Sequence, residues 1–306
     1  MPAADRVLDF SSAPAYVSVR DEQLVIRGKD QPSLSVPVNE IAVILLSGPA
    51  VTITQPALAS LLAANVGVVI GGGDRLPAGM LLPISGNTLS TQRLYQQIAM
   101  SAPRRKRLWQ SVVLAKILAQ AAALEEHGSD PTPLRALTAR LRSGDPDNLE
   151  ATAAQRYWPL LFGETFRRRA DADDCNRLLN YGYAVLRASI ARSICGAGLH
   201  PALGIHHRSR GNPFCLADDL MEPYRPLVDS EVRRIVGEWG ADMGMTPAIK
   251  QRLVESTQQR IEHEGEWRSS AEWFDRTAQS LLADENTSTN ANRVFYPAGI
   301  LRAGIT

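Results

Sequence analysis

The hydrophobic pattern of this chain changes its period near residue 90, and this change constrains the fold more than any other feature. Short β-rich runs come first, at 15–19, 23–28, 40–46, 50–53 and 66–70. Runs of this kind, separated by turn residues, predict strands. One segment, Gln55 to Ala64, instead has leucines at helical spacing behind Thr54, a residue type that caps helices. We therefore expect a compact β domain with a single packed helix.

After a polar linker at 86–91, the apolar residues follow a helical period. The sequence predicts a long helix from Gln92 to about Ala123, interrupted at Pro103, because proline lacks an N–H and clashes with the preceding turn. Further helices are predicted at about 131–143, 149–162, 174–198, 215–240, 246–264 and 268–283. The fold class is therefore α+β, with a small β domain over 1–85 and a larger all-α domain over 92–306.

Composition excludes several classes of protein. The 306-residue chain has a net charge of +1, so any binding to nucleic acid must come from local basic patches. Its three cysteines are widely spaced and form neither a CxxC pair nor a disulfide framework. The N-terminal residues lack the apolar core of a signal peptide, and no apolar run nears the roughly 20 residues that span a bilayer. We expect a soluble cytoplasmic protein that binds no membrane.

A histidine and several acids gather within residues 204–229. Asp218, Asp219 and Glu222 occupy positions i, i+1 and i+4 of a predicted helix, so their charges crowd together, and His207 precedes them. Carboxylates, an imidazole and nearby arginines suit a divalent metal ion that acts on a phosphate. The alternative is a solvated acidic face without function.

Glu150 is a further candidate because it stands in an alanine-rich segment ahead of Tyr157-Trp158. Small neighbours let a helix pack closely and carry the acid into a crowded interior. Such a glutamate either has a function or extends to solvent, and this segment by itself favours the structural interpretation.

Two basic clusters, at 104–107 and 167–169, leave a similar choice between a phosphate-binding surface and a solvated helix face. Within the predicted helix 174–198, we expect the polar side chains to be buried hydrogen-bonding groups; they are Asn176, Asn180, Tyr181 and Tyr183. Asp229-Ser230 ahead of Glu231 predicts a helix N-cap.

These segments, taken in order, resemble the CRISPR-associated integrase, the metal-dependent DNA-joining subunit of spacer acquisition, in the form found in type II systems. The resemblance covers nearly the whole chain. In the β domain it includes VPVNEIAVILLSGPAVTITQPALASLLAANVGVVI and LPAGMLLPISGN; in the helical domain it includes GETFRRRADADDCNRLLNYGYAVLR, GLHPALGIHH and NPFCLADDLMEPYRPLVD.

The resemblance implies a metal site built from three side chains. The family uses a glutamate before the Tyr-Trp pair, a histidine that closes a Gly-Ile-x-His motif, and an acid on the following helix; these positions are Glu150, His207 and Glu222. The family usually has an aromatic residue where His206 stands, so the ligand is assigned to His207. Asp219 is a candidate accessory acid.

The same resemblance implies the chemistry and the partners. Two carboxylates and one imidazole suit Mg²⁺ or Mn²⁺. In the family, the 3′-hydroxyl of a short double-stranded DNA, the prespacer, attacks a phosphodiester at the edge of a CRISPR repeat, and water in its place would cut DNA. Two copies would pair through the β domains as a homodimer. Two such dimers would flank a dimer of a small CRISPR-associated partner protein in a heterohexameric adaptation complex.

Two other functions stay open at this point. One is a metal-dependent DNA repair nuclease that acts mainly by hydrolysis. The other is a DNA-binding scaffold with no catalysis, against which the complete set of ligand residues argues.

Overall fold

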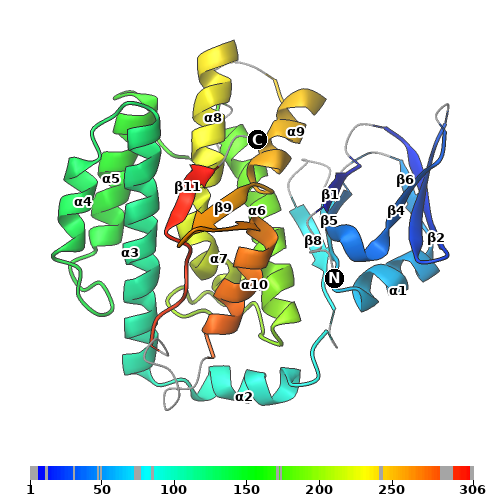
Figure 1. Ribbon diagram of the computed structural model, residues 1–306, viewed down its shortest axis with the longest axis horizontal. Coiled ribbons are helices and arrows are strands. Elements are labelled where there is room, and N and C mark those ends of the chain that lie inside the picture. The colour runs from blue at the N-terminus through cyan, green and yellow to red at the C-terminus, as the bar shows by residue number, and fades with distance from the viewer. Residues whose placement is uncertain are drawn as a thin grey trace.

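The computed structural model has an α+β architecture in which two strand-rich layers stand beside a larger body of helices (Figure 1). It describes residues 6–10, 13–29, 32–46, 48, 50–71, 77–83, 86–169, 172, 174–240, 244–282 and 292–303. The predicted fold class is confirmed.

The N-terminal region contains two four-stranded sheets. One has the order β1-β5-β7-β8 and the other the order β4-β3-β2-β6. The strands are β1 (Arg6–Asp9), β2 (Ala15–Arg20), β3 (Gln23–Gly28), β4 (Leu34–Pro37), β5 (Ile41–Leu46), β6 (Val51–Ile53), β7 (Gly67–Gly71) and β8 (Pro77–Leu81). The five predicted runs all form strands. The sequence did not reveal β1, β4 and β8, whose runs are too short or too mixed to show a period.

The packed helix α1 (Gln55–Ala63) lies over these sheets as expected. Thr54 caps it, because its side-chain oxygen accepts a hydrogen bond from the backbone N–H of Ala57 at 3.4 Å. Ala57 and Leu61 are completely buried and join the core of the β region. A short 3₁₀ helix, η1 (Val38–Glu40), leads into β5.

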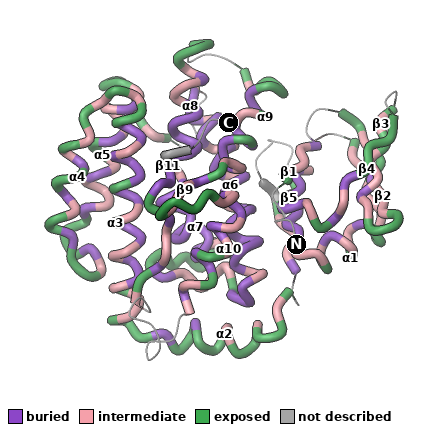
Figure 2. The backbone as a smooth tube through the Cα atoms, in the orientation of Figure 1, coloured by how far each residue is buried: buried purple, intermediate pink, exposed green. Residues whose placement is uncertain are grey.

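The second region is mainly helical. Its helices are α2 (Ser90–Ala99), α3 (Ala102–Glu126), α4 (Thr132–Thr138), α5 (Leu149–Phe162), α6 (Asn176–Gly196), α7 (Cys215–Met221), the 3₁₀ helix η2 (Glu222–Tyr224), α8 (Arg225–Trp239), α9 (Pro247–Ser256) and α10 (Ser270–Ser280). The buried residues of α3, α6 and α8 form one continuous core (Figure 2). Among the described helices, none is long and apolar enough to cross a membrane.

Pro103 marks the start of a helix and not a kink within one. The chain leaves α2 at Met100, and Ser101 caps α3 by accepting a hydrogen bond from the backbone N–H of Arg104. Proline is tolerated in the first turn because the N–H it lacks has no partner there. The predicted interruption is confirmed, and α2 begins at Ser90, inside the predicted linker. The domain boundaries themselves stay a prediction.

A small sheet lies where only helix was expected. The predicted helix 246–264 ends early, and the chain continues as β9 (Arg260–His263) and β10 (Glu266–Ser269); β11 (Gly299–Ala303) completes the order β10-β9-β11. The reason is a tight turn, since Glu264 and Gly265 both have positive φ, as two-residue hairpin turns require. The helical domain is therefore not all-α.

Candidate metal centre

Glu150 lies in the first turn of α5, and its backbone position is set by Asp145. The two carboxylate oxygens of Asp145 accept hydrogen bonds from the N–H groups of Leu149 and Glu150, at 2.8 and 2.9 Å. These are N–H groups that an α-helix leaves without partners at its start. The carboxylate of Glu150 is thus held near the end of the helix, where its side chain is 28% exposed.

Glu222 lies at a change of helical geometry. Helix α7 ends at Met221, the 3₁₀ helix η2 covers Glu222 to Tyr224, and α8 follows directly. Pro223 cannot continue the α-helical hydrogen bonding, which explains the tighter turn. The side chain of Glu222 is only 9% exposed, because η2 packs against α3.

Lys116, in the middle of α3, joins these two acids. Its Nζ forms an ion pair with Oε1 of Glu150 and a second ion pair, at 2.6 Å, with Oε2 of Glu222. The two carboxylates therefore converge on one cation, although they come from segments far apart in the sequence. Sequence reasoning missed Lys116. A signal was present, because Lys116 is the only charged residue within 108–124.

The charges at this site are strongly coupled. Burial opposes ionisation of Glu222, but Arg225 and Lys116 outweigh it and lower its pKa to about 2. Burial likewise acts to lower the pKa of Lys116, yet the negative charges of Glu222 and Glu150 leave that pKa above its ordinary value. Glu222 and Lys116 are therefore both charged at neutral pH.

The two oxygens of Glu222 differ in their partners. Oε1 accepts a hydrogen bond from Nε of Arg225 at 3.0 Å. Oε2 is buried and, within the described part of the chain, has the ion pair with Lys116 but no directed hydrogen bond. A buried carboxylate oxygen of this kind is suited to a metal ion.

His207 is held by Asp219. Its Nδ1 lies 2.5 Å from Oδ1 of Asp219, and this hydrogen bond raises the pKa of His207. Asp219 is completely buried and also accepts the backbone N–H groups of Ile205, His206 and His207. The loop is tight at Gly204, where an added Cβ would lie 2.3 Å from the carbonyl oxygen of His207. This arrangement leaves Nε2 of His207 as the nitrogen that can bind an ion.

His206 stacks on the indole ring of Trp109. Their ring centroids are 4.1 Å apart and the planes differ by 7°, whereas His207 meets the same indole edge-on at 5.7 Å. The two imidazole rings are nearly perpendicular to each other, with an interplanar angle of 89°. Trp109 lies on α3, two turns before Lys116, so one helix contacts both the histidine loop and the acidic pair.

The alternative of a solvated acidic face is wrong. Asp218, Asp219 and Glu222 are all buried. Asp218 does not join the other acids, since it pairs with Nε of Arg187 and accepts a hydrogen bond from Asn212, both at 2.7 Å.

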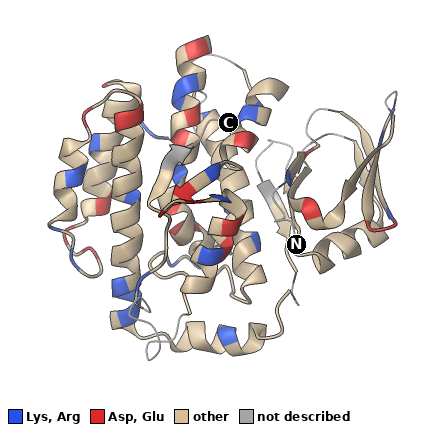
Figure 3. Ribbon diagram, viewed as in Figure 1, with Lys and Arg blue, Asp and Glu red and all other residues tan. Residues whose placement is uncertain are grey.

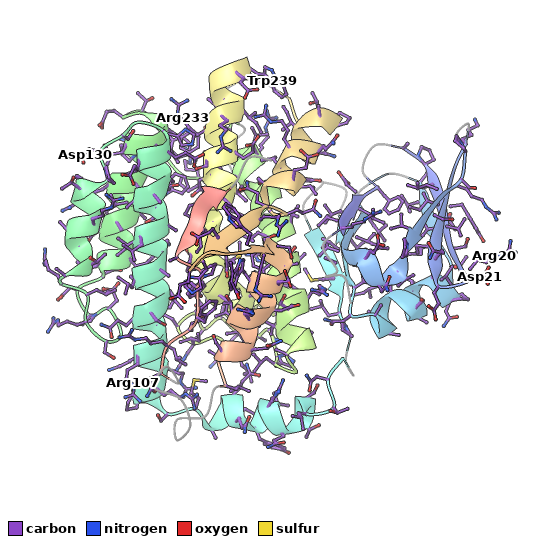
Figure 4. The ribbon with its side chains drawn as sticks, viewed as in Figure 1. Arg20, Asp21, Arg107, Asp130, Arg233 and Trp239 are labelled. Carbon is purple, nitrogen blue, oxygen red and sulfur yellow. The ribbon has the colours of Figure 1, made fainter. Side chains whose placement is uncertain are left out.

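The basic clusters make internal contacts. Basic residues gather at the lower end of α3 (Figure 3), where Arg107, labelled in Figure 4, donates to the side chain of Asn292 at 2.9 Å. Arg168, in the second cluster, donates to Asn176 and Asn180. These contacts favour a structural role for both arginines.

Asp229 is not a helix N-cap, which corrects the sequence prediction. It lies inside α8, is 1% exposed, and accepts hydrogen bonds from the hydroxyl groups of Tyr157, at 3.0 Å, and Tyr183. The chain before it is already helical because η2 runs directly into α8, so no helix start remains for it to cap. Tyr183 and Asn176 are buried hydrogen-bonding groups, as predicted.

The structure brings two of the three predicted ligands, Glu150 and Glu222, together on the ammonium group of Lys116. In the described part of the chain, no three His, Cys, Asp or Glu side chains lie close enough together to hold an ion. The ammonium group of Lys116 separates the acids in this arrangement. Glu150 and Glu222 nevertheless offer oxygen donors and His207 an imidazole nitrogen, which are donor types that can hold Mn²⁺ or Mg²⁺. Cavities of about 250 and 370 Å³ lie beside α2 and involve none of these residues.

Comparison with known proteins gives a consistent result. Residues 10–242 match the family model described as "CRISPR associated protein Cas1". A CRISPR-associated endonuclease Cas1 from Neisseria meningitidis is 38% identical over 283 residues, which are 92% of each chain. A casposase bound to integration product has a TM-score of 0.72 at 19% identity and covers 90% of this chain and 89% of its own. A Cas6-RT-Cas1–Cas2 complex has a TM-score of 0.72 at 18% identity, covering 97% of this chain and 36% of its own.

Proposed function

Since this chain belongs to the Cas1 family, we propose that it is a metal-dependent DNA integrase and endonuclease that inserts short foreign DNA into a CRISPR array. The observation that carries the proposal is the convergence of Glu150 and Glu222 on Nζ of Lys116, which lies 2.6 Å from Oε2 of Glu222. This oxygen is buried and has no other donor among the described residues. Two carboxylates that converge on one cation, one of them buried and the other partly exposed, give the oxygen donors that a divalent ion needs.

In the proposed site, Glu150, His207 and Glu222 hold Mg²⁺ or Mn²⁺. When bound, the ion would polarise the phosphoryl oxygen and neutralise the charge that develops on it. Asp219 would hold the proton on Nδ1 of His207, which would leave the lone pair of Nε2 for the ion. Arg225 engages Oε1 of Glu222, so Oε2, which pairs with Lys116, is the oxygen that would bind the ion.

DNA would approach over the loop that carries His207. Arg208 and Arg210 are exposed on this loop, next to a histidine whose side chain is 49% exposed. Guanidinium groups at such positions suit phosphate contacts, which stabilise binding without reading sequence. The incoming 3′-hydroxyl would replace one phosphate ester bond by another, with the displaced strand leaving as its own 3′-hydroxyl.

We further propose the partners that the family implies. These are double-stranded DNA, a second copy of this chain that pairs through the β region, and the small CRISPR-associated partner protein. The support is that the structural neighbours include a casposase bound to integration product and a Cas6-RT-Cas1–Cas2 complex.

A joining assay tests the proposal. The protein, with and without its small partner, is incubated with short DNA, a repeat-bearing plasmid and Mn²⁺ or Mg²⁺. Joined product is expected with the wild-type protein and is absent with Glu150→Ala. Failure of both proteins to join DNA, at saturating metal and with the partner present, would contradict an integrase function.

A hydrolytic nuclease is the second candidate. The relative from Neisseria meningitidis is named an endonuclease, and the half-exposed side chain of His207 shows that water reaches this part of the site. The same assay separates the two functions, because a nuclease yields cleaved DNA without a joined product.

A further inference from the structure

Lys116 contacts two of the proposed metal ligands but has no role as a ligand itself. Its side chain is 9% exposed and ends between α5 and η2, the two elements that carry Glu150 and Glu222. Helix α3 packs against both elements in the core of the helical region, and this packing positions Lys116 between them.

A cation at this point offsets the repulsion between the two acids. Like charges in a poorly solvated place repel strongly, since little water screens them. The ammonium group contacts one oxygen of each carboxylate and brings the local charge closer to neutral. The metal-free protein can therefore keep the two carboxylates close together.

The same contact blocks the atom that a metal ion needs. Oε1 of Glu222 is engaged by Arg225 at 3.0 Å, so Oε2 is the oxygen left for an ion. Oε2 is also the atom that Lys116 contacts at 2.6 Å. An ammonium group and a dication that share this oxygen would repel each other at short range.

We propose that Lys116 is a built-in counter-cation that competes with the divalent ion for Glu150 and Glu222. Its ammonium group occupies the carboxylates in the metal-free protein and leaves them when the ion binds. Lys116 thus keeps the site assembled and also weakens its affinity for metal, which sets the metal concentration at which the site fills. This inference rests on the proposed metal-dependent function.

Metal binding, measured without DNA, tests the inference. Purified full-length protein is stripped with chelator and titrated with Mn²⁺, and free Mn²⁺ is followed by electron paramagnetic resonance. Lys116→Met is expected to lower the Kd for Mn²⁺ by about tenfold, which corresponds to about 1.4 kcal/mol. Lys116→Arg keeps the charge and is expected to bind Mn²⁺ about as weakly as the wild type.

Lys250→Met provides the matched control. Lys250 is also a buried helical lysine, at 8% exposure, but its Nζ lies over the ring of Tyr181, 5.7 Å from the ring centre. This variant is expected to leave the Kd unchanged. An equal or weaker affinity of Lys116→Met for Mn²⁺ would overturn the inference, because it would show that the lysine supports the ion or does not compete with it.

Thermal unfolding in chelator gives a second readout. Lys116→Met is expected to lower the melting temperature, and adding Glu150→Gln to it is expected to restore part of the loss by removing one of the two repelling charges. Independent effects of the two changes would speak against the inference. Where the methionine variant fails to fold, Lys116→Gln, which is neutral but still donates hydrogen bonds, serves in both measurements.

The outcomes separate this inference from the proposed function. If the wild-type protein binds no Mn²⁺, or if Glu150→Ala binds it unchanged, the proposed metal site itself is wrong. If binding depends on Glu150 and Glu222 while Lys116→Met has the wild-type Kd, the site is right and the role of Lys116 is wrong.

Discussion

Glu222 in η2 and Asp229 in the helix α8 that follows it are both buried, with whole-residue exposures of 7% and 1%. The two acids differ in the charges around them. Glu222 faces two cations, Lys116 and Arg225, and its pKa falls to about 2. Asp229 faces two tyrosine hydroxyls, and burial raises its pKa to about 7 in spite of their hydrogen bonds.

The difference shows that burial alone does not identify a functional acid. A carboxylate with cationic partners stays charged, and in the proposed site it would exchange a lysine for a metal ion. A carboxylate with neutral donors in a dry interior is close to protonation and mainly holds helices together. Arg225 lies between the two environments. Its Nε donates a hydrogen bond to Glu222, and its guanidinium group stacks over Tyr183, 4.5 Å from the ring centre.

The largest expected effect comes from removing one of the three proposed metal ligands. Glu150→Ala, His207→Ala and Glu222→Ala should each reduce DNA joining by more than about 100-fold, since loss of a ligand exceeds the effect of losing a supporting residue. The yield of joined plasmid measures this, and the melting temperature shows whether each variant folds. His206→Ala is the control and should keep joining; an inactive His206→Ala beside an active His207→Ala would move the ligand by one residue.

A smaller effect is expected from changing a residue that contacts a proposed ligand but not the ion itself. Asp219→Asn should weaken Mn²⁺ binding by about 10–100-fold, because it removes the charge that orients His207. Titration with Mn²⁺ measures the change. Asp218→Asn is the matched control, since Asp218 pairs with Arg187, and it should leave the Kd nearly unchanged. Equal affinities for the two variants would count against His207 as a ligand.

The pH dependence of the free energy of unfolding should reveal the raised pKa of Asp229. The pKa of Asp229 is raised from 3.8 in its ordinary state to about 7 in the folded protein, so the folded state binds the extra proton between these values. The contribution of Asp229 to stability is therefore complete below pH 4 and lost as the pH rises to 7, with a slope on the order of 1 kcal/mol per pH unit. Asp229→Asn removes this slope, and urea unfolding at several pH values measures it; identical pH profiles for variant and wild type would contradict the raised pKa.

The smallest effect should follow from loss of one hydroxyl. Tyr157→Phe removes one hydrogen bond to Asp229 and should destabilise the protein by about 1 kcal/mol, with no change in Mn²⁺ affinity. Denaturant unfolding and metal titration on the same samples check both parts. Tyr16→Phe, at an exposed position on β2, should change neither quantity. A marked loss of Mn²⁺ affinity in Tyr157→Phe would show that the two sites are coupled.

Much of the fold could be predicted from the sequence because its signals are local. The helix at 149–162 and the strand at 23–28 have the predicted bounds, and Thr54 caps α1 as expected. Local patterns failed where a turn interrupted a period, as at Glu264-Gly265. The Asp229 prediction failed because a short polar pair looks the same at a helix start and inside a continuous helix.

The sequence by itself determined the α+β class and, through the family motifs, pointed to Glu150, His207 and Glu222. Only the tertiary structure showed that Lys116 lies between two of these residues, that Asp219 anchors the histidine loop, and that Asp229 belongs to a separate neutral site. The physical reason is that backbone patterns depend on neighbours along the chain. The charge state and partners of a buried acid depend instead on which distant helices pack around it.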